Sequence, residues 1–240
     1  MMVACRQGQV VPTEKVSHTM AATEQTRWTA VLFDFDGTLG DSIDLIISSL
    51  RATAAELPGY TFDEAAIRPW IGRPLTAMLL EHGVTDHAEW ITVYRRHYRR
   101  AHDEMLRPIE GILGLLERLA NAGARIGVVS SKRTDYIELS LNRLGLDSWI
   151  DVIVGADNTQ RHKPDPEPLL HAARLLDAVP SRCVYVGDAV TDVVAGRAAG
   201  MATVAVTWGA ATADDLAGAG PTAVVSNVAE LAAQLLTDAR

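Results

Sequence analysis

Cysteine is scarce in this chain, since only Cys5 and Cys183 occur among its 240 residues. Their spacing matches no zinc site, and two cysteines do not make a disulfide framework. A small zinc-binding domain and a small disulfide-rich domain are therefore both excluded. No apolar run reaches the length of a membrane-spanning helix. Residues 1–26 lack the apolar core of a signal peptide, and we expect them to form a disordered tail. Together these absences predict a cytoplasmic protein with no membrane partner.

Positive charge is also in deficit. The chain has 22 Lys and Arg against 30 Asp and Glu, which gives a formal net charge of −8. This balance argues against nucleic acid or an anionic membrane as a partner, and a bound phosphate would need a local cation or a metal. The hydrophobic content of 48% is enough for a substantial core, in one large α/β domain or in a core with a smaller insertion.

The most informative stretch begins with the apolar run 30–33, which is typical of a strand buried on both faces. It leads directly into Asp34 and Asp36, followed by Gly37 and the hydroxyl of Thr38. Parallel sheets bind ligands beyond the carboxyl ends of their strands, so these groups are expected to face a crevice. Asp and Gly are also common in turns, and an ordinary polar strand end is the alternative.

The two carboxylates suit phosphate chemistry. Each disfavours ionisation of the other, and a hard cation such as Mg²⁺ would remove that conflict because it prefers oxygen ligands. One carboxylate could hold the metal and attack as a nucleophile, while the other transfers protons. Gly37 permits a tight turn that brings amide groups towards an anion.

A helical block is predicted next. Asp41 and Ser42 can cap a helix that runs to about Leu57, and helical patterns continue over 63–70, 74–82 and 86–105. No strand signal appears between Gly40 and Pro108. The sequence therefore predicts a helical cap domain at residues 41–107, inserted into an α/β core formed by residues 27–40 and 108–240.

Strands and helices alternate after the insertion, which predicts a doubly wound parallel sheet with right-handed crossovers. The predicted strands are 125–129, 150–154, 183–186, 201–206 and 222–225. The predicted helices are 112–121, 134–144, 167–176, 190–199 and 228–239.

Further polar groups stand at the ends of the predicted strands. Ser130 and Ser131 follow the second strand, Lys163 lies in the loop after the third, and Asp188 and Asp192 follow the fourth. Taken singly, they could be a helix cap, a solvated lysine and a turn. Because all fall at the same end of consecutive strands, a joint functional site is the better interpretation.

This set resembles the four motifs of the haloacid dehalogenase superfamily. The run 34–38 (D-F-D-G-T) resembles the first motif, Ser130 the second, Lys163 the third, and G-D-x-x-x-D at 187–192 the fourth. The resemblance implies that Asp34 is the nucleophile and Asp36 the general acid/base of the phosphatase branch, since the dehalogenase branch lacks the second aspartate.

The resemblance also implies the remaining roles. Gly37, Ser130, Ser131 and Lys163 would bind the phosphoryl group. Mg²⁺ would be held by Asp34, Asp188 and the backbone carbonyl of Asp36, with Asp192 mainly behind them. The position of the insertion matches the subgroup that has its cap between the first two motifs.

Within that subgroup the chain resembles the phosphoglycolate phosphatase-like enzymes. The supporting pieces are 41–42 (D-S), 71–75 (I-G-R-P-L) and 163–168 (K-P-D-P-E-P). One departure is Ser131, where many members carry Asn. Residues 42–49 also contain no histidine, whereas the related β-phosphoglucomutases carry one there, so a mutase is disfavoured.

The sequence thus predicts a Mg²⁺-dependent phosphatase acting on a small phosphorylated metabolite, as a monomer or homodimer. Alternatives are a pyrophosphatase, a sugar-phosphate phosphatase, a phosphoglucomutase or a nucleotidase. From another class, a receiver-like or non-catalytic phosphate-binding module is possible, although a receiver has no helical cap. Arg73 is a candidate for binding a substrate anion, or else a solvated arginine. The arginine-rich segment 94–102 is typical of a solvated helix face, part of which could line a cleft.

Overall fold

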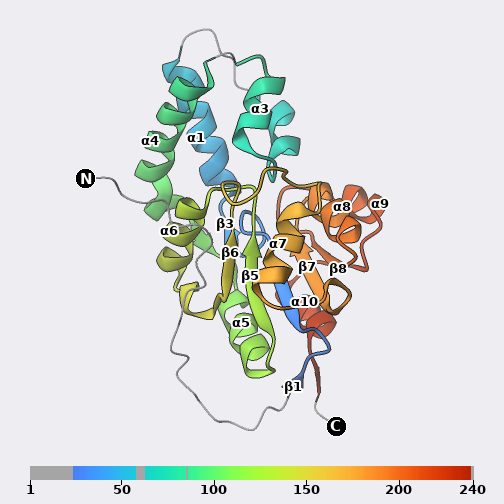
Figure 1. Ribbon diagram of the computed structural model, residues 1–240. Coiled ribbons are helices and arrows are strands. Elements are labelled where there is room, and N and C mark those ends of the chain that lie inside the picture. The colour runs from blue at the N-terminus through green and yellow to red at the C-terminus, as the bar shows by residue number, and fades with distance from the viewer. Residues whose placement is uncertain (1–23, 58–62, 85, 239–240) are drawn as a thin grey trace, which may run out of the picture.

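The computed structural model describes residues 24–57, 63–84 and 86–238. Its centre is a six-stranded sheet with the order β6-β5-β2-β7-β8-β9, in which all neighbours are parallel (Figure 1). The strands are β2 Ala30–Phe33, β5 Arg125–Val129, β6 Val152–Val154, β7 Cys183–Gly187, β8 Ala202–Val206 and β9 Ala223–Val225. The predicted doubly wound α/β fold is confirmed.

The middle strand, β2, is fully buried on both faces. Val31 and Phe33 belong to one hydrophobic core, and Ala30 and Leu32 belong to the other. Because alternate side chains of a strand point to opposite faces, one apolar run contributes to both layers. Full burial of side chains such as Leu32 or Phe33 stabilises the fold by about 1.5–3 kcal/mol each.

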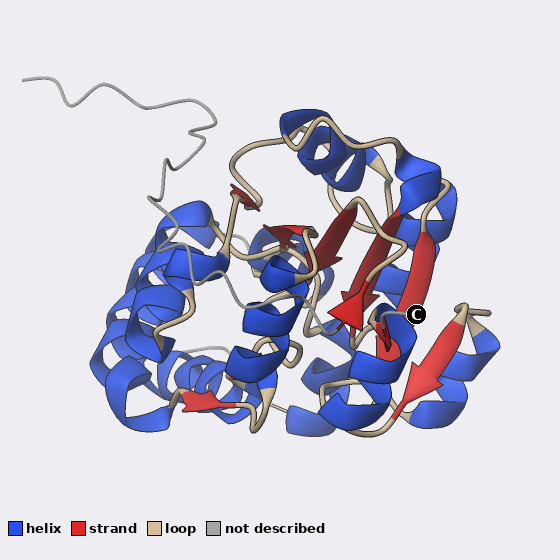
Figure 2. Cartoon of the chain, turned by 90° about the horizontal axis from the view of Figure 1, so that it is seen from below, coloured by secondary structure: helices blue, strands red, loops and turns tan. Residues whose placement is uncertain are grey.

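Helices cover both faces of the sheet (Figure 2). On the face of Val31 lie α5 Ile112–Asn121, α6 Thr134–Leu144 and α10 Val228–Leu235. On the face of Leu32 lie α7 Glu167–Leu175 and α8 Val190–Ala198. The short helix α9 Ala213–Gly218 adds Leu216 to a small cluster with Val193 and Ala205.

The helical block between β2 and β5 has a core of its own. Its elements are α1 Ile43–Glu56, α2 Glu64–Ile67, the 3₁₀ turn η1 Arg68–Trp70, α3 Leu75–Glu81 and α4 His87–Met105. Leu50, Met78, Leu79 and Trp90 form the centre of that core. Figure 1 shows the block above the carboxyl ends of the strands.

Two short extended segments join the block to the sheet domain. Gly40–Asp41 (β3) and Arg107–Pro108 (β4) pair as antiparallel strands. The sequence showed no strand signal there, because a two-residue ladder has no periodicity to detect. The pairing brings the two connections of the block side by side.

The two ends of the described chain differ from expectation. Glu24–Gln25 (β1) lies inside the predicted tail but pairs with Thr237–Asp238 (β10), and the Thr26 hydroxyl donates to the carbonyl of Leu235 at 2.7 Å. The closing helix therefore ends at Leu235, short of the predicted end. Residues 1–23 of the predicted tail lie outside the described residues.

Two other points concern helices. Helix α9 was not predicted, because its small and acidic residues carry little apolar periodicity. Among the helices that the structure describes, none has the length and apolar character needed to cross a bilayer.

Glycine at position 155 is expected to be essential for the packing of two loops. A Cβ there would lie 2.5 Å from the backbone nitrogen of Thr134 and 2.8 Å from the carbonyl of Lys132. Gly155→Ala should therefore destabilise the protein by about 1–3 kcal/mol in urea unfolding. Gly114, on the exposed side of α5, has no atom within 4 Å of such a Cβ. Gly114→Ala is the control and should stabilise by about 0.5–1 kcal/mol; equal stabilities would contradict this account.

Candidate active site

The predicted site residues meet at the carboxyl ends of the central strands. Asp34 directly follows β2, Ser130 follows β5, and Asp188 follows β7. All three are buried, as is Lys163 in the loop after β6. The strand order places β2 between β5 and β7, so groups distant in sequence converge on Asp34.

The loop after β2 turns back on itself. The amides of Leu39 and Gly40 both donate to the carbonyl of Phe35, and Gly37 has a φ of +75°. A Cβ at Gly37 would lie 2.4 Å from Oδ2 of Asp188, and a Cβ at Gly209 would lie 2.1 Å from the same atom. Glycine is therefore required at Gly37 both by conformation and by the approach of the Asp188 carboxylate.

Three carboxylates form a compact buried cluster. One oxygen each from Asp34, Asp188 and Asp192 lies within 4.8 Å of the others. The carboxylate of Asp36 is not part of this cluster. If Asp36 also contacts a metal, its backbone carbonyl remains as the ligand, which is the atom that the resemblance implied.

Lys163 lies within this cluster. Its Nζ is 2.6 Å from Oδ1 of Asp192 and 2.9 Å from Oδ2 of Asp34, and it donates to the Tyr185 hydroxyl at 2.9 Å. Burial alone would lower the pKa of Lys163, but Asp192 and Asp34 raise it above its ordinary value. Lys163 is therefore a buried cation, and the alternative of a solvated loop lysine is wrong.

The carboxylates are nonetheless short of positive charge. Burial raises the pKa of Asp34 to about 6, with Lys163 opposing the rise and Asp192 adding to it. Burial, followed by the charges of Asp192 and Asp34, raises the pKa of Asp188 well above its ordinary value. A divalent cation among these oxygens would favour their ionised forms, so the cluster fits a hard metal ion.

Each acidic side chain is held in place by neighbours. Asp188 accepts from the Thr38 hydroxyl at 3.0 Å and from the amide of Ala210 at 2.7 Å. Asp192 accepts from Lys163 and, through its other oxygen, from the amide of Ala189 at 3.0 Å. Both oxygens of Asp192 are thus held by neighbours, as are both oxygens of Asp188.

Asp36 has a separate environment that the sequence analysis missed. Its Oδ1 lies 2.6 Å from Nζ of Lys132 and accepts from the Ser42 hydroxyl at 2.6 Å. Lys132 also donates to the hydroxyl of Tyr98 on α4 at 2.6 Å. Burial alone would lower the pKa of Lys132, but Asp36 and Tyr98 raise it above its ordinary value, so Lys132 is charged.

Two of these partners carried a signal in the sequence. Lys132 stands two residues after Ser130, just beyond the carboxyl end of β5. This position could have identified it as a residue of the site. Ser42 was expected to cap α1 and does occupy the cap position, but its side chain makes no cap hydrogen bond and donates to Asp36 instead. Tyr98 looked like part of a charged helix, and only the packing of α4 brings its hydroxyl to Lys132.

The two serines after β5 lie on the same side as Asp34. The Ser130 hydroxyl faces Asp34 and opposes the rise in the pKa of that carboxyl. The buried hydroxyl oxygen of Ser131 has no hydrogen-bond partner among the described residues. It is therefore available to a ligand.

A cavity of about 320 Å³ lies between the sheet domain and the helical block. Asp34, Asp36, Ser130 and Ser131 line its floor. Arg73 lines the helical side, with its guanidinium 4.0 Å above the ring of Trp70.

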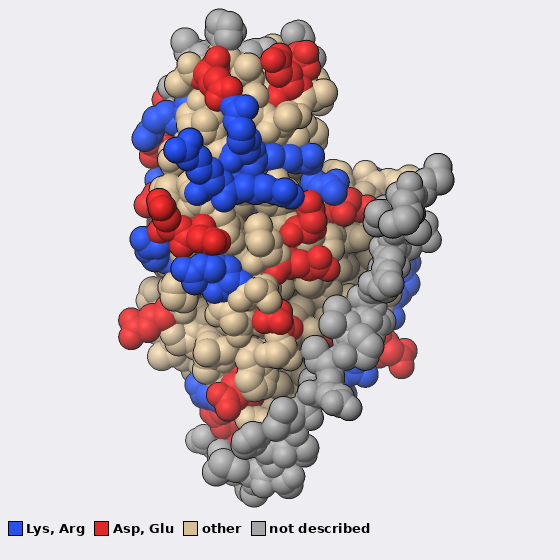
Figure 3. Space-filling model, turned by 90° about the vertical axis from the view of Figure 1, so that its left-hand side faces the viewer, with Lys and Arg blue, Asp and Glu red and all other residues tan. Residues whose placement is uncertain are grey.

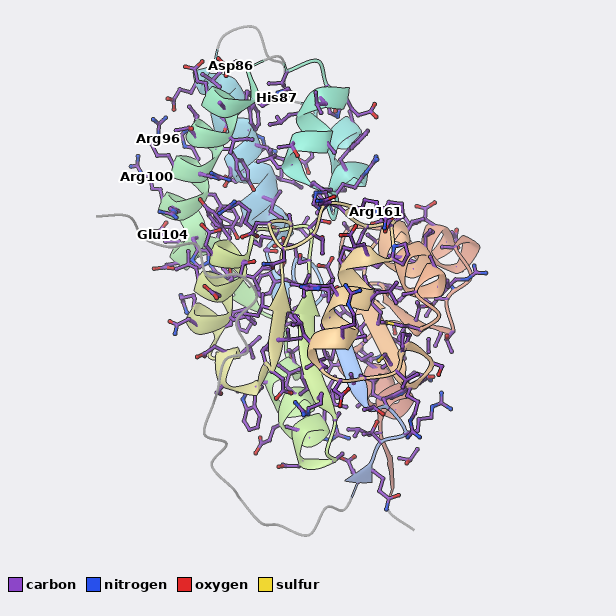
Figure 4. The ribbon with its side chains drawn as sticks, viewed as in Figure 1. Asp86, His87, Arg96, Arg100, Glu104 and Arg161 are labelled. Atoms are coloured by element: carbon purple, nitrogen blue, oxygen red, sulfur yellow. The ribbon has the colours of Figure 1, made fainter. Side chains whose placement is uncertain are left out.

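The arginines of α4 divide between surface and cavity. Arg96, Arg99 and Arg100 are exposed, and Figure 3 shows basic side chains gathered on this face beside acidic ones. Arg96 pairs with Glu56, and Figure 4 shows Arg96, Arg100 and Glu104 along the outer side of the helix. Arg95 instead lines the cavity.

Comparison with known proteins defines the class. Residues 31–206 match the family model described as haloacid dehalogenase-like hydrolase. The pyrophosphatase PpaX of Bacillus velezensis is 34% identical over 205 residues, which is 85% of this chain and 95% of that protein. The pyrophosphatase PpaX of Bacillus mycoides is 37% identical over 178 residues, 74% of this chain and 83% of that protein.

Solved structures agree. A haloacid dehalogenase-like family hydrolase from Streptococcus pneumoniae has a TM-score of 0.77 at 25% identity, covering 87% of this chain and 98% of its own. A hydrolase from Pseudomonas syringae has a TM-score of 0.75 at 26% identity, covering 83% and 94%. The chain belongs to the haloacid dehalogenase-like hydrolases. It is an enzyme of the phosphatase type. Membership of this family excludes the receiver alternative.

Metal binding should stabilise the protein in a pH-dependent way. Because the pKa of Asp34 is raised to about 6 in the folded state, the contribution of this group to the stability of the metal-free protein is lost as pH rises through about 6, and the raised pKa of Asp188 acts in the same direction. Mg²⁺ needs the ionised carboxylates, so it should stabilise more at pH 7.5 than at pH 5. At ten times its Kd the gain is about 1.4 kcal/mol, or roughly 3–6 °C in Tm for a chain of this size.

The measurement is thermal unfolding with Mg²⁺ and with chelator at both pH values. Asp188→Asn should lose most of the Mg²⁺-dependent rise in Tm. An equal rise at pH 5 and pH 7.5, or an undiminished rise in the variant, would contradict metal binding at this cluster.

Proposed function

We propose that the chain is a Mg²⁺-dependent phosphatase that hydrolyses a phosphate monoester through an aspartyl phosphate on Asp34. The observation that carries the proposal is the contrast between two neighbouring carboxylates. Asp34 lies in a buried cluster with Lys163, 2.9 Å from its Nζ, whereas Asp36 is held apart by Ser42 and Lys132. Two carboxylates in different environments suit two different roles.

Asp34 is the nucleophile in this proposal. Its carboxylate attacks phosphorus and displaces the alcohol, and water later cleaves the acyl phosphate. Lys163, Ser130 and Ser131 hold the oxygens of the transferring group, because they present a buried cation and two hydroxyls on the same side of Asp34. A bound Mg²⁺ would neutralise charge on the phosphoryl oxygens and keep Asp34 ionised.

Asp36 is the proton carrier. It protonates the leaving oxygen in the first step and takes a proton from the attacking water in the second. Ser42 and Lys132 fix the orientation of its carboxylate. Lys132 acts through Asp36 and is therefore a positioning residue.

We further propose that residues 41–107 act as a cap over the cavity. The block contacts the site through Tyr98 and lines the cavity with Arg73 and Arg95. The β3–β4 pair, where the two connections of the block meet, is the expected hinge. Closure would exclude water from the acyl phosphate until the alcohol has left.

The sequence motifs favour a phosphoglycolate-like monoester as substrate, whereas the named relatives are pyrophosphatases. A panel separates these possibilities: 2-phosphoglycolate, pyrophosphate, sugar phosphates and nucleoside monophosphates, each with Mg²⁺ and with chelator. Phosphate release that requires Mg²⁺ supports the proposal. Failure to release phosphate from any of them, with folded protein, would count against it.

Asp34→Asn should abolish turnover while leaving the fold intact. Asparagine keeps the shape of the side chain but cannot attack phosphorus, so kcat should fall by at least about 10³-fold, the order of loss when a nucleophile is removed. Steady-state phosphate release measures this, with circular dichroism as the test of folding. Asp214→Asn, on the exposed surface of α9, is the control and should keep full activity. Substantial activity in Asp34→Asn would remove it as nucleophile.

Lys132→Met should lower kcat/KM only for substrates whose leaving group needs a proton, because kcat/KM reports the steps up to departure of the alcohol. Without its cation, Asp36 is expected to be poorly oriented, and kcat/KM on an alkyl phosphate should fall by about 10²-fold, within the usual contribution of general acid catalysis. With p-nitrophenyl phosphate, whose leaving group departs unprotonated, the fall should be much smaller. Lys132→Arg should recover part of the activity. An equal loss on both substrates would point to a general structural role instead.

A further inference from the structure

The cavity above Asp34 has two chemically different ends. Its floor carries the two carboxylates, the two serines and Lys132. The wall contributed by the helical block includes Arg73 and Arg95, but most of its side chains are apolar, among them Ile46, Leu50, Trp70, Leu75, Met78 and Ile91. A molecule that fills this cavity meets polar groups at one end and a mainly apolar wall with two arginines at the other.

Much of this apolar wall is left uncovered by the protein itself. Ile46, Trp70, Leu75, Ile91 and Tyr94 pack against the core of the block but are only partly buried, and all five line the cavity. Apolar surface in contact with water is unfavourable, and a ligand that covers it recovers that free energy. The uncovered wall therefore favours a ligand with an apolar part.

The cavity is also rich in aromatic rings. Aromatic residues make up only 5% of the chain, yet four of them line this cavity: Trp70, Tyr94 and Tyr98 from the helical block and Tyr136 from α6. Trp70 and Tyr94 are partly exposed, whereas Tyr98 and Tyr136 are buried. The rings of Tyr94 and Tyr98 are 5.9 Å apart between centroids, and those of Tyr98 and Tyr136 are 5.4 Å apart. Aromatic side chains in such arrays interact best with another flat ring, by offset stacking or edge-to-face contact.

The size of the cavity points in the same direction. Its volume of about 320 Å³ reaches the range of roughly 300–1,000 Å³ typical of pockets for small organic molecules. Pyrophosphate and phosphoglycolate have no apolar ring. Their second anionic group would find Arg73 or Arg95, but neither compound would cover the apolar side chains of the wall.

From these observations we infer that the substrate is a phosphate monoester whose alcohol carries a flat aromatic ring, seated beside Tyr94 and against the stacked pair of Arg73 and Trp70. The inference rests on the phosphatase function proposed above, and it specifies the substrate class. The ring can belong to a simple arylalkyl alcohol or to a nucleobase, since both present a flat π face.

The first test compares substrates whose leaving alcohols have similar reactivity. These are benzyl phosphate, cyclohexylmethyl phosphate and ethyl phosphate, assayed with the full chain and Mg²⁺. We expect kcat/KM for benzyl phosphate to exceed that for ethyl phosphate by at least about 100-fold, since a single methylene in an apolar pocket is worth about 10–200-fold. The cyclohexyl compound should be intermediate. Adenosine 5′-monophosphate distinguishes a nucleobase from a simple ring, according to whether it exceeds benzyl phosphate.

The second test fills the cavity from its rim. Thr76 lines the cavity and is exposed, so Thr76→Trp adds a ring without removing a core side chain. It should lower kcat/KM for benzyl phosphate at least about 10-fold more than for ethyl phosphate, as expected when an apolar contact is blocked. Leu80→Trp, at a position that is 63% exposed on the same helix α3, is the matched control and should not change the ratio.

The outcomes separate the inference from the function on which it rests. Equal kcat/KM for benzyl and ethyl phosphate, or for benzyl and cyclohexylmethyl phosphate, would overturn the inference while leaving the phosphatase intact. If neither these esters nor any member of the panel described under the proposed function is hydrolysed, the proposed function fails. Calorimetric binding of benzyl and ethyl phosphate to Asp34→Asn then decides the inference independently: equal affinity overturns it, and tighter binding of the benzyl ester supports it.

Discussion

The arrangement of the site depends on one buried cation between two buried carboxylates, Lys163 with Asp34 and Asp192. A carboxylate this deeply buried would be strongly biased towards its neutral form without a positive partner, and a lysine this deeply buried would tend to lose its proton. Each group therefore stabilises the charged form of the other. The contact also connects the loop after β6 to the carboxyl end of β2 and the first turn of α8. The charge pairing of the site and the relative positions of these elements therefore depend on each other.

A second cation, Lys132, pairs with the carboxylate of Asp36, as Lys163 pairs with that of Asp34. Unlike Lys163, it also contacts the helical block. Its ammonium lies between Asp36 and the hydroxyl of Tyr98 on α4. Asp36, the proposed acid/base group, is thus linked directly to the helical block. In the proposed mechanism, this link would let the position of the block over the cavity influence proton transfer, while Asp34, the proposed nucleophile, remains fixed by the sheet.

The helical block combines two functions in one set of side chains. Its own small core holds α1, α3 and α4 together, and the partly buried rim of that core forms the wall of the cavity. The surface proposed to recognise the organic part of a substrate is therefore the edge of a folding core. Substitutions in this wall are therefore expected to alter both the stability of the block and the specificity for substrate. The polar floor differs, because its groups stand at the ends of strands.

The sequence by itself determined the sheet and the polar groups at the ends of its strands. The apolar runs gave the limits of β2 and β5 as the structure has them, because a strand buried on both faces leaves a continuous hydrophobic signal. Strand-end chemistry gave Asp34, Ser130, Lys163 and Asp188, since parallel strands bring their carboxyl ends together. Only the tertiary structure decided the rest. The Lys132–Tyr98 contact, the pairing of β1 with β10 and the aromatic wall join residues far apart in the chain, and no local pattern encodes which distant side chains will meet.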